Sequence, residues 1–375
     1  MVQPSKLCRH YLAFAGLGLG AAGGAMAWDP TALAGFFYHP KLLAVVHFLT
    51  LGWITSSLLA FFHLVPDRGT QASSTYDGKG RADLLAFWIL ALGASGVMSH
   101  FWIGETSGVG WSGLLVGMVI LREGIRGILR WQGTSIPPGL TLGATLAVFH
   151  LLLAAVLAMG IVLDRYFDIL PGFVLTHVFT HAHLAALGWA LLLLASFADT
   201  VLPGTPSSHS GKWIGLFEAL LLLLAVGLWT GVGLPWTALP VALLVLGITA
   251  GWWWSPRLAA LPRNRRRLFL EALVYLSLAA VLGLLVLFLP EGPWSLRLTL
   301  AYGVLGLLGG LATLTLALLR HLLPEPSSAW PFDAWSVVVP ATALGFTFDL
   351  LPLIRLGGLA ILLTAAFGAR RWIQS

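Results

Sequence analysis

Two short segments of the chain nearly repeat each other, and each begins with a histidine. Residues 47–53 read His-Phe-Leu-Thr-Leu-Gly-Trp, and residues 183–189, 136 positions later, read His-Leu-Ala-Ala-Leu-Gly-Trp. Both run on through apolar residues to a proline, Pro66 in the first and Pro203 in the second. An ionisable group in so apolar a framework is costly and marks a candidate functional site. Because neutral imidazole binds haem iron and copper, His47 and His183 are predicted to be paired ligands of a cofactor held between helices.

Further histidines lie close to the second segment. His181 and His183 are two residues apart, so on an α-helix they point about 200° apart and cannot hold one ion together. Each could serve a different cofactor on either side of the helix. His177 and His181 share a face and could meet one metal or one haem, and His150 is a further candidate metal ligand. The alternative is that these histidines only form hydrogen bonds between helices.

The chain around these histidines has the composition of a membrane protein. Of its 375 residues, 58% are hydrophobic and only 10% are charged, a balance that soluble domains do not show. The sequence therefore predicts an all-α polytopic membrane protein with about twelve transmembrane helices of roughly 20 residues each. Their expected ranges are 11–28, 40–65, 84–103, 109–129, 140–163, 171–202, 212–234, 236–254, 268–289, 296–322, 335–352 and 354–371.

Lysine and arginine orient these spans. With the N-terminus in the cytoplasm, only Lys41, Arg165, Arg297 and Arg355 of the 21 basic residues fall outside. This excess on the inner side predicts a bacterial or archaeal inner-membrane protein with both termini cytoplasmic. The net charge of +6 therefore reflects topology and not nucleic-acid binding. The basic run 263–267 is expected to be an inner loop, with an acidic-lipid site as the alternative.

A third segment is related to the first two. Residues 308–310, Leu-Gly-Gly, open a run that ends at 320–324 as Arg-His-Leu-Leu-Pro, close to His-Leu-Val-Pro at 63–66. Glycine recurs at one position in all three, whereas Val304 stands where the others have histidine. Four helices separate each pair, so the segments run in one direction and the chain divides into three parallel pseudo-repeats. Their approximate ranges are 1–131, 132–266 and 267–375.

Residues 181–189, His-Ala-His-Leu-Ala-Ala-Leu-Gly-Trp, resemble the tenth helix of the catalytic subunit of haem-copper oxidases. The resemblance is closest to the cbb-type oxidases and the nitric oxide reductases, which also have twelve spans in three parallel repeats. It implies that His181 binds a high-spin haem and that His183 and His47 are the axial ligands of a low-spin haem. It also implies haem b as the cofactor, in one or two copies.

The chain departs from that family in its histidine pattern. No two histidines are adjacent, so the pair that holds copper is absent, and the His-x-His motif lies four helices after the first ligand, not eight. The single cysteine, Cys8, excludes a Cys-x-x-Cys-His covalent haem site and a disulfide framework. A looser resemblance is to the NnrS family, which contains haem and copper and is linked to the nitric oxide response.

The expected function is membrane electron transfer or the handling of nitric oxide or oxygen, and whether the protein is an enzyme stays open. A quinol or a cytochrome would donate electrons, and other respiratory subunits and the lipid bilayer are the expected partners. His181 could bind a second haem or a metal with His177 or His150, and copper is the candidate metal. One alternative is a nitric oxide response or metal-homeostasis protein without turnover, which copper alongside haem would favour. Another is a transporter that uses its intramembrane histidines, and a last is a structural subunit of a respiratory complex.

Overall fold

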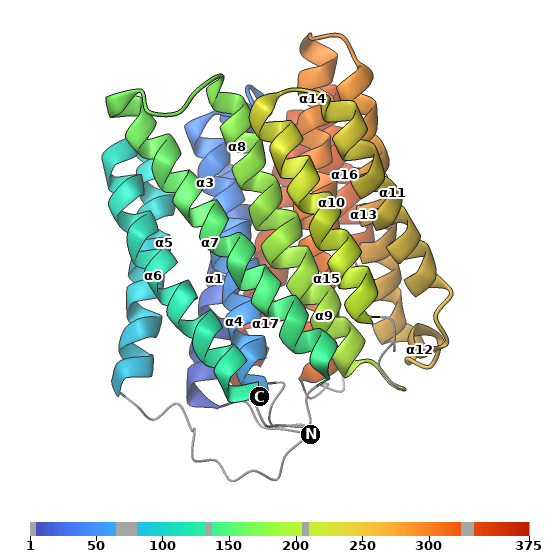
Figure 1. Cartoon of the computed structure of the whole chain (residues 1–375). Coiled ribbons are helices and arrows are strands. Elements are labelled where there is room, and N and C mark those ends of the chain that lie inside the picture. The colour runs from blue at the N-terminus through green and yellow to red at the C-terminus, as the bar shows by residue number, and fades with distance from the viewer. Residues whose placement is uncertain (1–4, 65–80, 132–136, 205–209, 324–333, 375) are drawn as a thin grey trace.

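The computed structural model describes residues 5–64, 81–131, 137–204, 210–323 and 334–374. Within these ranges the chain is almost entirely helical and contains no β-strand. The long helices run roughly side by side and form one bundle (Figure 1). The predicted all-α class is confirmed, whereas the predicted proline exits Pro66 and Pro324 lie outside the described residues.

Helices with two kinds of hydrogen bonding make up the bundle. The elements are, in chain order, α1 (Lys6–Trp28), α2 (Pro30–Ala34), α3 (Pro40–His47), η1 (Phe48–Thr55), α4 (Ser56–Leu64), α5 (Arg81–Ile103), α6 (Thr106–Trp131), α7 (Pro138–Phe167), α8 (Val174–His183), η3 (Leu184–Leu191), α9 (Leu192–Val201), α10 (Ser210–Thr230), α11 (Leu234–Trp253), α12 (Pro256–Ala259), α13 (Arg263–Phe288), α14 (Pro293–Gly303), η4 (Val304–Ala312), α15 (Thr313–Leu322), α16 (Trp335–Phe348) and α17 (Leu351–Gln374). The elements labelled η are π-helical.

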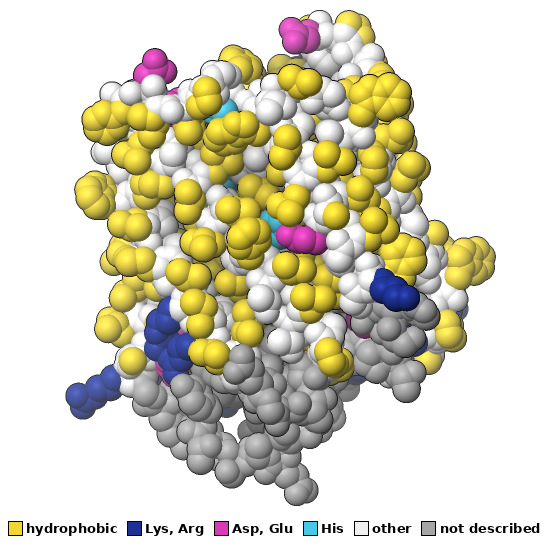
Figure 2. Space-filling model, in the orientation of Figure 1, with side chains coloured by type: hydrophobic (Ala, Val, Ile, Leu, Met, Phe, Trp, Pro, Cys, Tyr) yellow, Lys and Arg dark blue, Asp and Glu magenta, His cyan; other side chains and the backbone are white. Residues whose placement is uncertain are grey.

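Ten of the described helical segments are long and apolar enough to cross a membrane, against about twelve predicted. The predicted spans 109–129 and 335–352 correspond to α6 and α16, which are not among the ten. α6 has 26 residues and carries charges toward its end, and α16 has only 14 residues. Apolar side chains cover the middle of the surface and basic ones gather near one end (Figure 2). The chain is a multi-pass membrane protein in which α1 begins and α17 ends on one side (Figure 1).

Three helices change to π-helical hydrogen bonding in their middle. η1 continues α3, η3 continues α8, and η4 continues α14. The three π-helical segments end at Thr55, Leu191 and Ala312, which are separated by the same 136 and 121 residues as the related sequence segments. A π turn holds more residues than an α turn and leaves some backbone groups poorly paired. The related sequences therefore share a local backbone distortion as well as residue types.

Tryptophan side chains join the three π-helical segments. Trp53 Nε1 of η1 donates a hydrogen bond to the carbonyl of Ala312 in η4, at 3.4 Å. Trp189 Nε1 of η3 donates to Thr55 Oγ1 in η1, at 3.1 Å. Both tryptophans are almost fully buried. The tryptophans therefore fill the centre of the bundle and satisfy polar groups that no water reaches.

Hydroxyl groups satisfy carbonyls inside two of the π-helical segments. Ser56 Oγ donates to the carbonyl of Leu51 at 3.0 Å, and Thr313 Oγ1 donates to that of Leu308 at 3.1 Å, each five residues back. Trp335 of α16 in turn donates to Thr313 Oγ1 at 2.6 Å. Each hydroxyl donates across the same five-residue spacing as π-helical backbone pairing, so these contacts fit the π-helical geometry.

Packing changes along the three central helices at these segments. Residues that follow Gly52, Gly188 and Gly309 are nearly all buried. Residues that precede these glycines are a mixture of buried and half-buried ones. One half of the bundle therefore has a tightly packed centre, and the other retains accessible surface around its central helices. His47 and His183 lie in the looser half.

Glycines let α1 pack closely against two other helices. α1 contacts η1 and α17. A Cβ added to Gly18 would lie 2.6 Å from Gly52 Cα, and one added to Gly23 would lie 2.6 Å from the carbonyl oxygen of Gly358. Glycine is required at such sites because the backbones themselves are in contact.

We expect Gly23→Ala to destabilise the protein, because the new methyl group meets the backbone of α17, which cannot move aside as a side chain could. Overpacking of this kind costs about 1–3 kcal/mol. Gly24 is the matched control, since no atom lies within 4 Å of a Cβ added there. Gly24→Ala should be neutral or stabilising, because alanine is the better helix former by roughly 1 kcal/mol. Thermal unfolding in detergent compares the two, and equal melting temperatures would contradict this packing.

Candidate functional site

His47 is the last residue of α3 and directly precedes the π-helical segment η1. Its Nδ1 lies 2.7 Å from the carbonyl oxygen of Leu43, and its ring stacks on that of Phe101 with centroids 4.8 Å apart. Protein surrounds the ring, yet the residue is only half-buried. His47 therefore borders accessible space inside the looser half of the bundle.

His181 lies on α8 and faces α7 and α3. Its Nδ1 is 2.9 Å from the carbonyl oxygen of Ala154 on α7. His181 and His47 are close enough for a charge on one to act on the other. No described hydrogen bond or ring contact joins His181 to His47, and the described contact of His181 leads to α7.

His183, the last residue of α8, has neighbours of a different kind. Its Nδ1 is 2.8 Å from the carbonyl oxygen of Phe179, the same arrangement as at His47. Its Nε2 is 3.0 Å from the hydroxyl of Tyr302 on α14, and the two rings stack with centroids 6.1 Å apart. The described contacts of His183 therefore lead to α14 and not to His47.

These hydrogen bonds determine the tautomer of all three imidazoles. A carbonyl oxygen only accepts, so Nδ1 carries the proton in each ring and Nε2 presents its electron pair. Within the described part of the chain, the Nε2 atoms of His47 and His181 have no hydrogen-bond partner and remain accessible. Tyr302 donates its hydroxyl proton to the Nε2 of His183. An Nε2 electron pair set by a second hydrogen bond on Nδ1 is the usual state of a metal-binding histidine.

The backbone hydrogen bond alone does not distinguish a ligand. His10 and His100 make the same contact with a carbonyl four residues back, at 2.7 Å in both cases. Both lie toward the ends of their helices, away from the central half-buried region. The combination of this hydrogen bond with a central position and an accessible Nε2 sets His47 and His181 apart.

His177 is buried and turned toward another helix. It is 1% exposed, and its ring lies 4.3 Å from that of Trp229 on α10. Neither of its ring nitrogens has a hydrogen-bond partner among the described residues. The shared helix face predicted for His177 and His181 does not give them the same neighbours, because His181 binds to α7.

His150 pairs with a carboxylate in the middle of the bundle. Its Nε2 lies 2.7 Å from Glu218 Oε2 on α10, and its side chain is fully buried. The imidazole packs directly on the backbone of Gly188, where any added Cβ would collide with it. The glycine of the second sequence segment therefore serves to seat His150 against η3.

The predicted metal ligands do not converge on one point. Within the described ranges, no group of three or more His, Cys, Asp and Glu side chains is placed to hold a metal ion. Tyr302 is the site residue that the sequence analysis missed. The available signal was its position, since it stands 121 residues after His181 and so occupies the place of that histidine in the third related segment.

A charged cluster outside the spans holds the start of the helix that carries His47. Asp29 accepts a hydrogen bond from the backbone N–H of Ala32 at 3.2 Å and pairs with Lys41 Nζ at 2.7 Å. Lys41 is the second residue of α3, and its Nζ lies 5.3 Å from the ring centroid of Trp102. The hydrogen bond from Lys41, together with that from Ala32, lowers the pKa of Asp29 below its ordinary value of 3.8.

No protein-family model matches the chain, and no curated protein matches it either. The functional interpretation therefore depends on the contacts of its own side chains.

The lowered pKa of Asp29 gives a pH-dependent contribution to stability. It is fully present above pH 3.8 and is lost as the pH falls through the lower pKa of the folded state. Asp29→Asn keeps the helix cap but removes the charge, so we expect it to melt earlier than wild type at pH 6, by about 1 kcal/mol or less because the pair is partly exposed. This difference should shrink as the pH falls below 3.8. A difference that does not depend on pH would rule out the ion pair as its source.

Removal of the carboxylate at Glu218 should expose the cost of burying His150. Glu218→Leu leaves both ring nitrogens of His150 without a described partner, since Nδ1 already has none, and an unsatisfied buried group costs about 1–3 kcal/mol. Glu218→Gln keeps an acceptor for the Nε2 proton and should melt close to wild type. Thermal unfolding in detergent measures both variants. Similar losses in the two would show that the hydrogen bond is unimportant.

Proposed function

We propose that this protein binds haem among its central membrane helices and acts in electron transfer or in the binding of nitric oxide or oxygen. The observation that carries the proposal is the state of His47 and His181. Each donates its Nδ1 proton to a backbone carbonyl and presents an accessible Nε2 inside the bundle. Haem iron binds histidine in this state. The resemblance of the histidine motif to that of haem-copper oxidases supports the same cofactor.

The residues present are compatible with a haem group. The half-buried residues around His47 and His183 provide accessible surface in the apolar half of the bundle. Gly303, beside Tyr302, faces open space, with no atom within 4 Å of an added Cβ. The aromatic ring of Phe101 already stacks on His47. A flat apolar macrocycle matches a space with small, aromatic and histidine borders.

Two assignments of the axial ligands follow from this site. The motif resemblance favours His47 with His183, and His183 would then exchange the hydroxyl of Tyr302 for iron. The shared state of the two imidazoles favours His47 with His181, since each presents an accessible Nε2. In either assignment the remaining histidine would hold a second haem or a copper ion, for which His177 and His150 are further ligand candidates.

The chain itself would orient the ligands and control access to them. The carbonyls of Leu43 and Ala154 hold two imidazoles in place and raise the basicity of their Nε2 atoms. Tyr302 borders the site and donates a hydrogen bond to His183. A bound haem would supply one-electron chemistry, and an open coordination position would accept a gas. A quinol or a separate cytochrome would donate the electrons, and respiratory subunits are the expected partners.

The proposal includes a topology. We propose twelve spans in three parallel four-helix repeats, with α6 and the short helix α16 as spans in addition to the ten. The recurrence of a π-helical segment at the 136- and 121-residue offsets supports this repeat. We place the end where α1 begins in the cytoplasm of a bacterial or archaeal cell, because basic residues gather at that end.

A second candidate function is proton-linked transport. The observation that favours it is the pair of His150 and Glu218, two titratable groups in contact at the middle of the bundle. Such pairs carry protons in transporters. A protein without haem would leave this as the leading function.

An optical spectrum of the purified protein tests the proposal. We expect sharp bands on reduction in the wild type, and a loss of at least about tenfold in bound haem in His47→Ala, because ligand removal has effects of this order or larger. His10→Ala is the matched control, since His10 makes the same backbone hydrogen bond outside the site. It should keep its full haem content.

Carbon monoxide distinguishes the two haem functions. Reduced bands that do not change with carbon monoxide would indicate a sealed haem and electron transfer. A shifted spectrum would indicate an open position and gas binding. A flat spectrum from protein expressed with added haem, which still elutes as a single species, would refute the haem proposal.

A further inference from the structure

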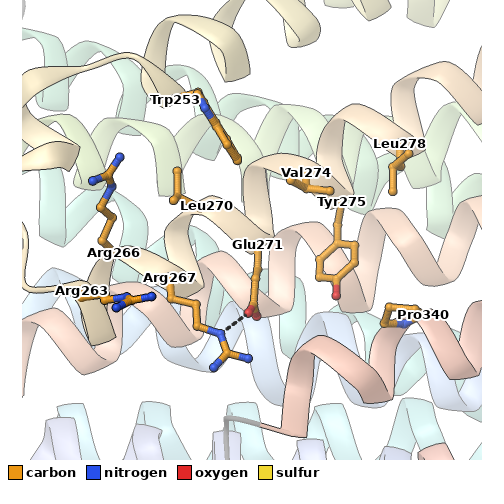
Figure 3. A pocket seen from close by; sticks show the side chains of 10 residues that line it. All are labelled: Trp253, Arg263, Arg266, Arg267, Leu270, Glu271, Val274, Tyr275, Leu278 and Pro340. Carbon is orange, nitrogen blue, oxygen red and sulfur yellow. Dashed lines mark hydrogen bonds and ion pairs between the residues drawn. The ribbon is translucent and has the colours of Figure 1, made fainter.

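A groove on the side of the bundle combines a cationic end with an apolar wall. Its volume is about 660 Å³, and it lies between the first half of α13, Trp253 of α11 and Pro340 of α16 (Figure 3). The groove is open on one side. None of the histidines of the candidate site lines it, so it is a separate feature of the molecule.

Three arginines from the first turns of α13 form the cationic end. Arg267 is already engaged, because its Nε pairs with Glu271 at 2.7 Å and its Nη2 donates to Ser336 of α16 at 2.6 Å. Arg263 and Arg266 form no ion pair with any described carboxylate, and the Nε of Arg266 is buried without an acceptor there. Two guanidinium groups therefore face the groove with their charge uncompensated. Guanidinium groups bind phosphate oxygens well.

The apolar wall continues from these arginines along one face of α13. Leu270, Val274 and Leu278 are spaced four residues apart and all line the groove. Val274 and Leu278 are 41% and 47% exposed, so this wall faces the surroundings of the bundle. From Arg267 to Leu278 the helix rises about 16 Å. That is about half of the ~30 Å hydrocarbon core of a bilayer, so the wall spans one leaflet.

We propose that this groove binds an anionic glycerophospholipid from the leaflet that adjoins the arginines. Its phosphate lies between Arg263 and Arg266, and an acyl chain follows Leu270, Val274 and Leu278. A soluble phosphate would meet the charges but leave the apolar wall uncovered. A zwitterionic lipid would cover the wall, but the cationic amine of its headgroup would lie close to the arginines. Only an anionic lipid matches both ends of the groove.

The bound lipid also adjoins a contact between two helices. Arg267 joins α13 to Ser336 of α16, and the hydroxyl of Tyr275 lies 3.4 Å from the carbonyl oxygen of Ser336. Both Arg267 and Tyr275 line the groove. The lipid is therefore expected to stabilise the α13–α16 contact as well as to occupy the surface.

Native mass spectrometry of the full-length protein tests the site, with phosphatidylglycerol and phosphatidylcholine of equal chain length as probes. We expect phosphatidylglycerol to bind roughly tenfold more tightly, and the variant R263Q/R266Q to lose that preference, because each interfacial arginine attracts an anionic lipid appreciably. Arg265→Gln is the matched control. It removes one charge from the same turn, but Arg265 does not line the groove. Its preference should stay within about twofold of wild type.

Several outcomes would overturn the proposal. If R265Q and the single variant R266Q lost the preference for phosphatidylglycerol equally, the attraction would be a general charge effect without a site. Competition by millimolar inorganic phosphate would indicate a soluble anion as the ligand. Equal binding of the two lipids by the wild type would remove the role of the arginines. A different pair of results would support the site. R266Q should melt at the same temperature as wild type in phosphatidylcholine, which would show that the variant folds, and phosphatidylglycerol should no longer stabilise it.

Discussion

A membrane offers no water to a buried backbone group, and this constraint governs the centre of the molecule. The three π-helical segments depart from regular α-helical pairing where the centre of the bundle changes from loose to tight packing. Ser56 and Thr313 supply hydroxyl donors to carbonyls five residues back, and Trp53 and Trp189 bring indole N–H groups from one segment to the next. The hydroxyl donors come from the same helix, and the indole donors come from neighbouring helices. The remaining helices pack around this core.

The candidate site depends on that core in two ways. His47 and His183 are each the last α-helical residue before a π-helical segment, so the change in helix type determines their direction. A glycine follows each histidine after five residues and leaves room for a neighbour. Gly52 lies against Gly18 of α1, and Gly188 lies against the ring of His150. The tight half of the bundle thus acts as a rigid base. The half that carries the histidines retains the accessible surface that a cofactor needs.

Much of this arrangement could be predicted from the sequence. Composition and apolar stretches of spanning length predict the helical membrane bundle. The recurrent glycine marks all three helices with a π-helical segment, and the recurrent His and Trp mark two of them. The π-helical segments themselves could not be predicted, because the apolar residues of these segments are equally compatible with regular α-helical pairing. The neighbours of each histidine could not be predicted from the sequence either. His150 and Glu218 are 68 residues apart in the sequence, and Tyr302 and His183 are 119 residues apart. Sequence spacing does not predict which side chains meet over such separations.

The contact between α1 and α17 has a consequence for biosynthesis. A chain is made from its N-terminus, so the first helix enters the membrane long before its partner exists. Gly23 can meet Gly358 only when the last helix has been inserted. Until then α1 has the contact of Gly18 with Gly52 and an uncovered glycine face. The bundle therefore closes in a late step, and the nascent protein must keep that face covered by lipid or by the insertion machinery.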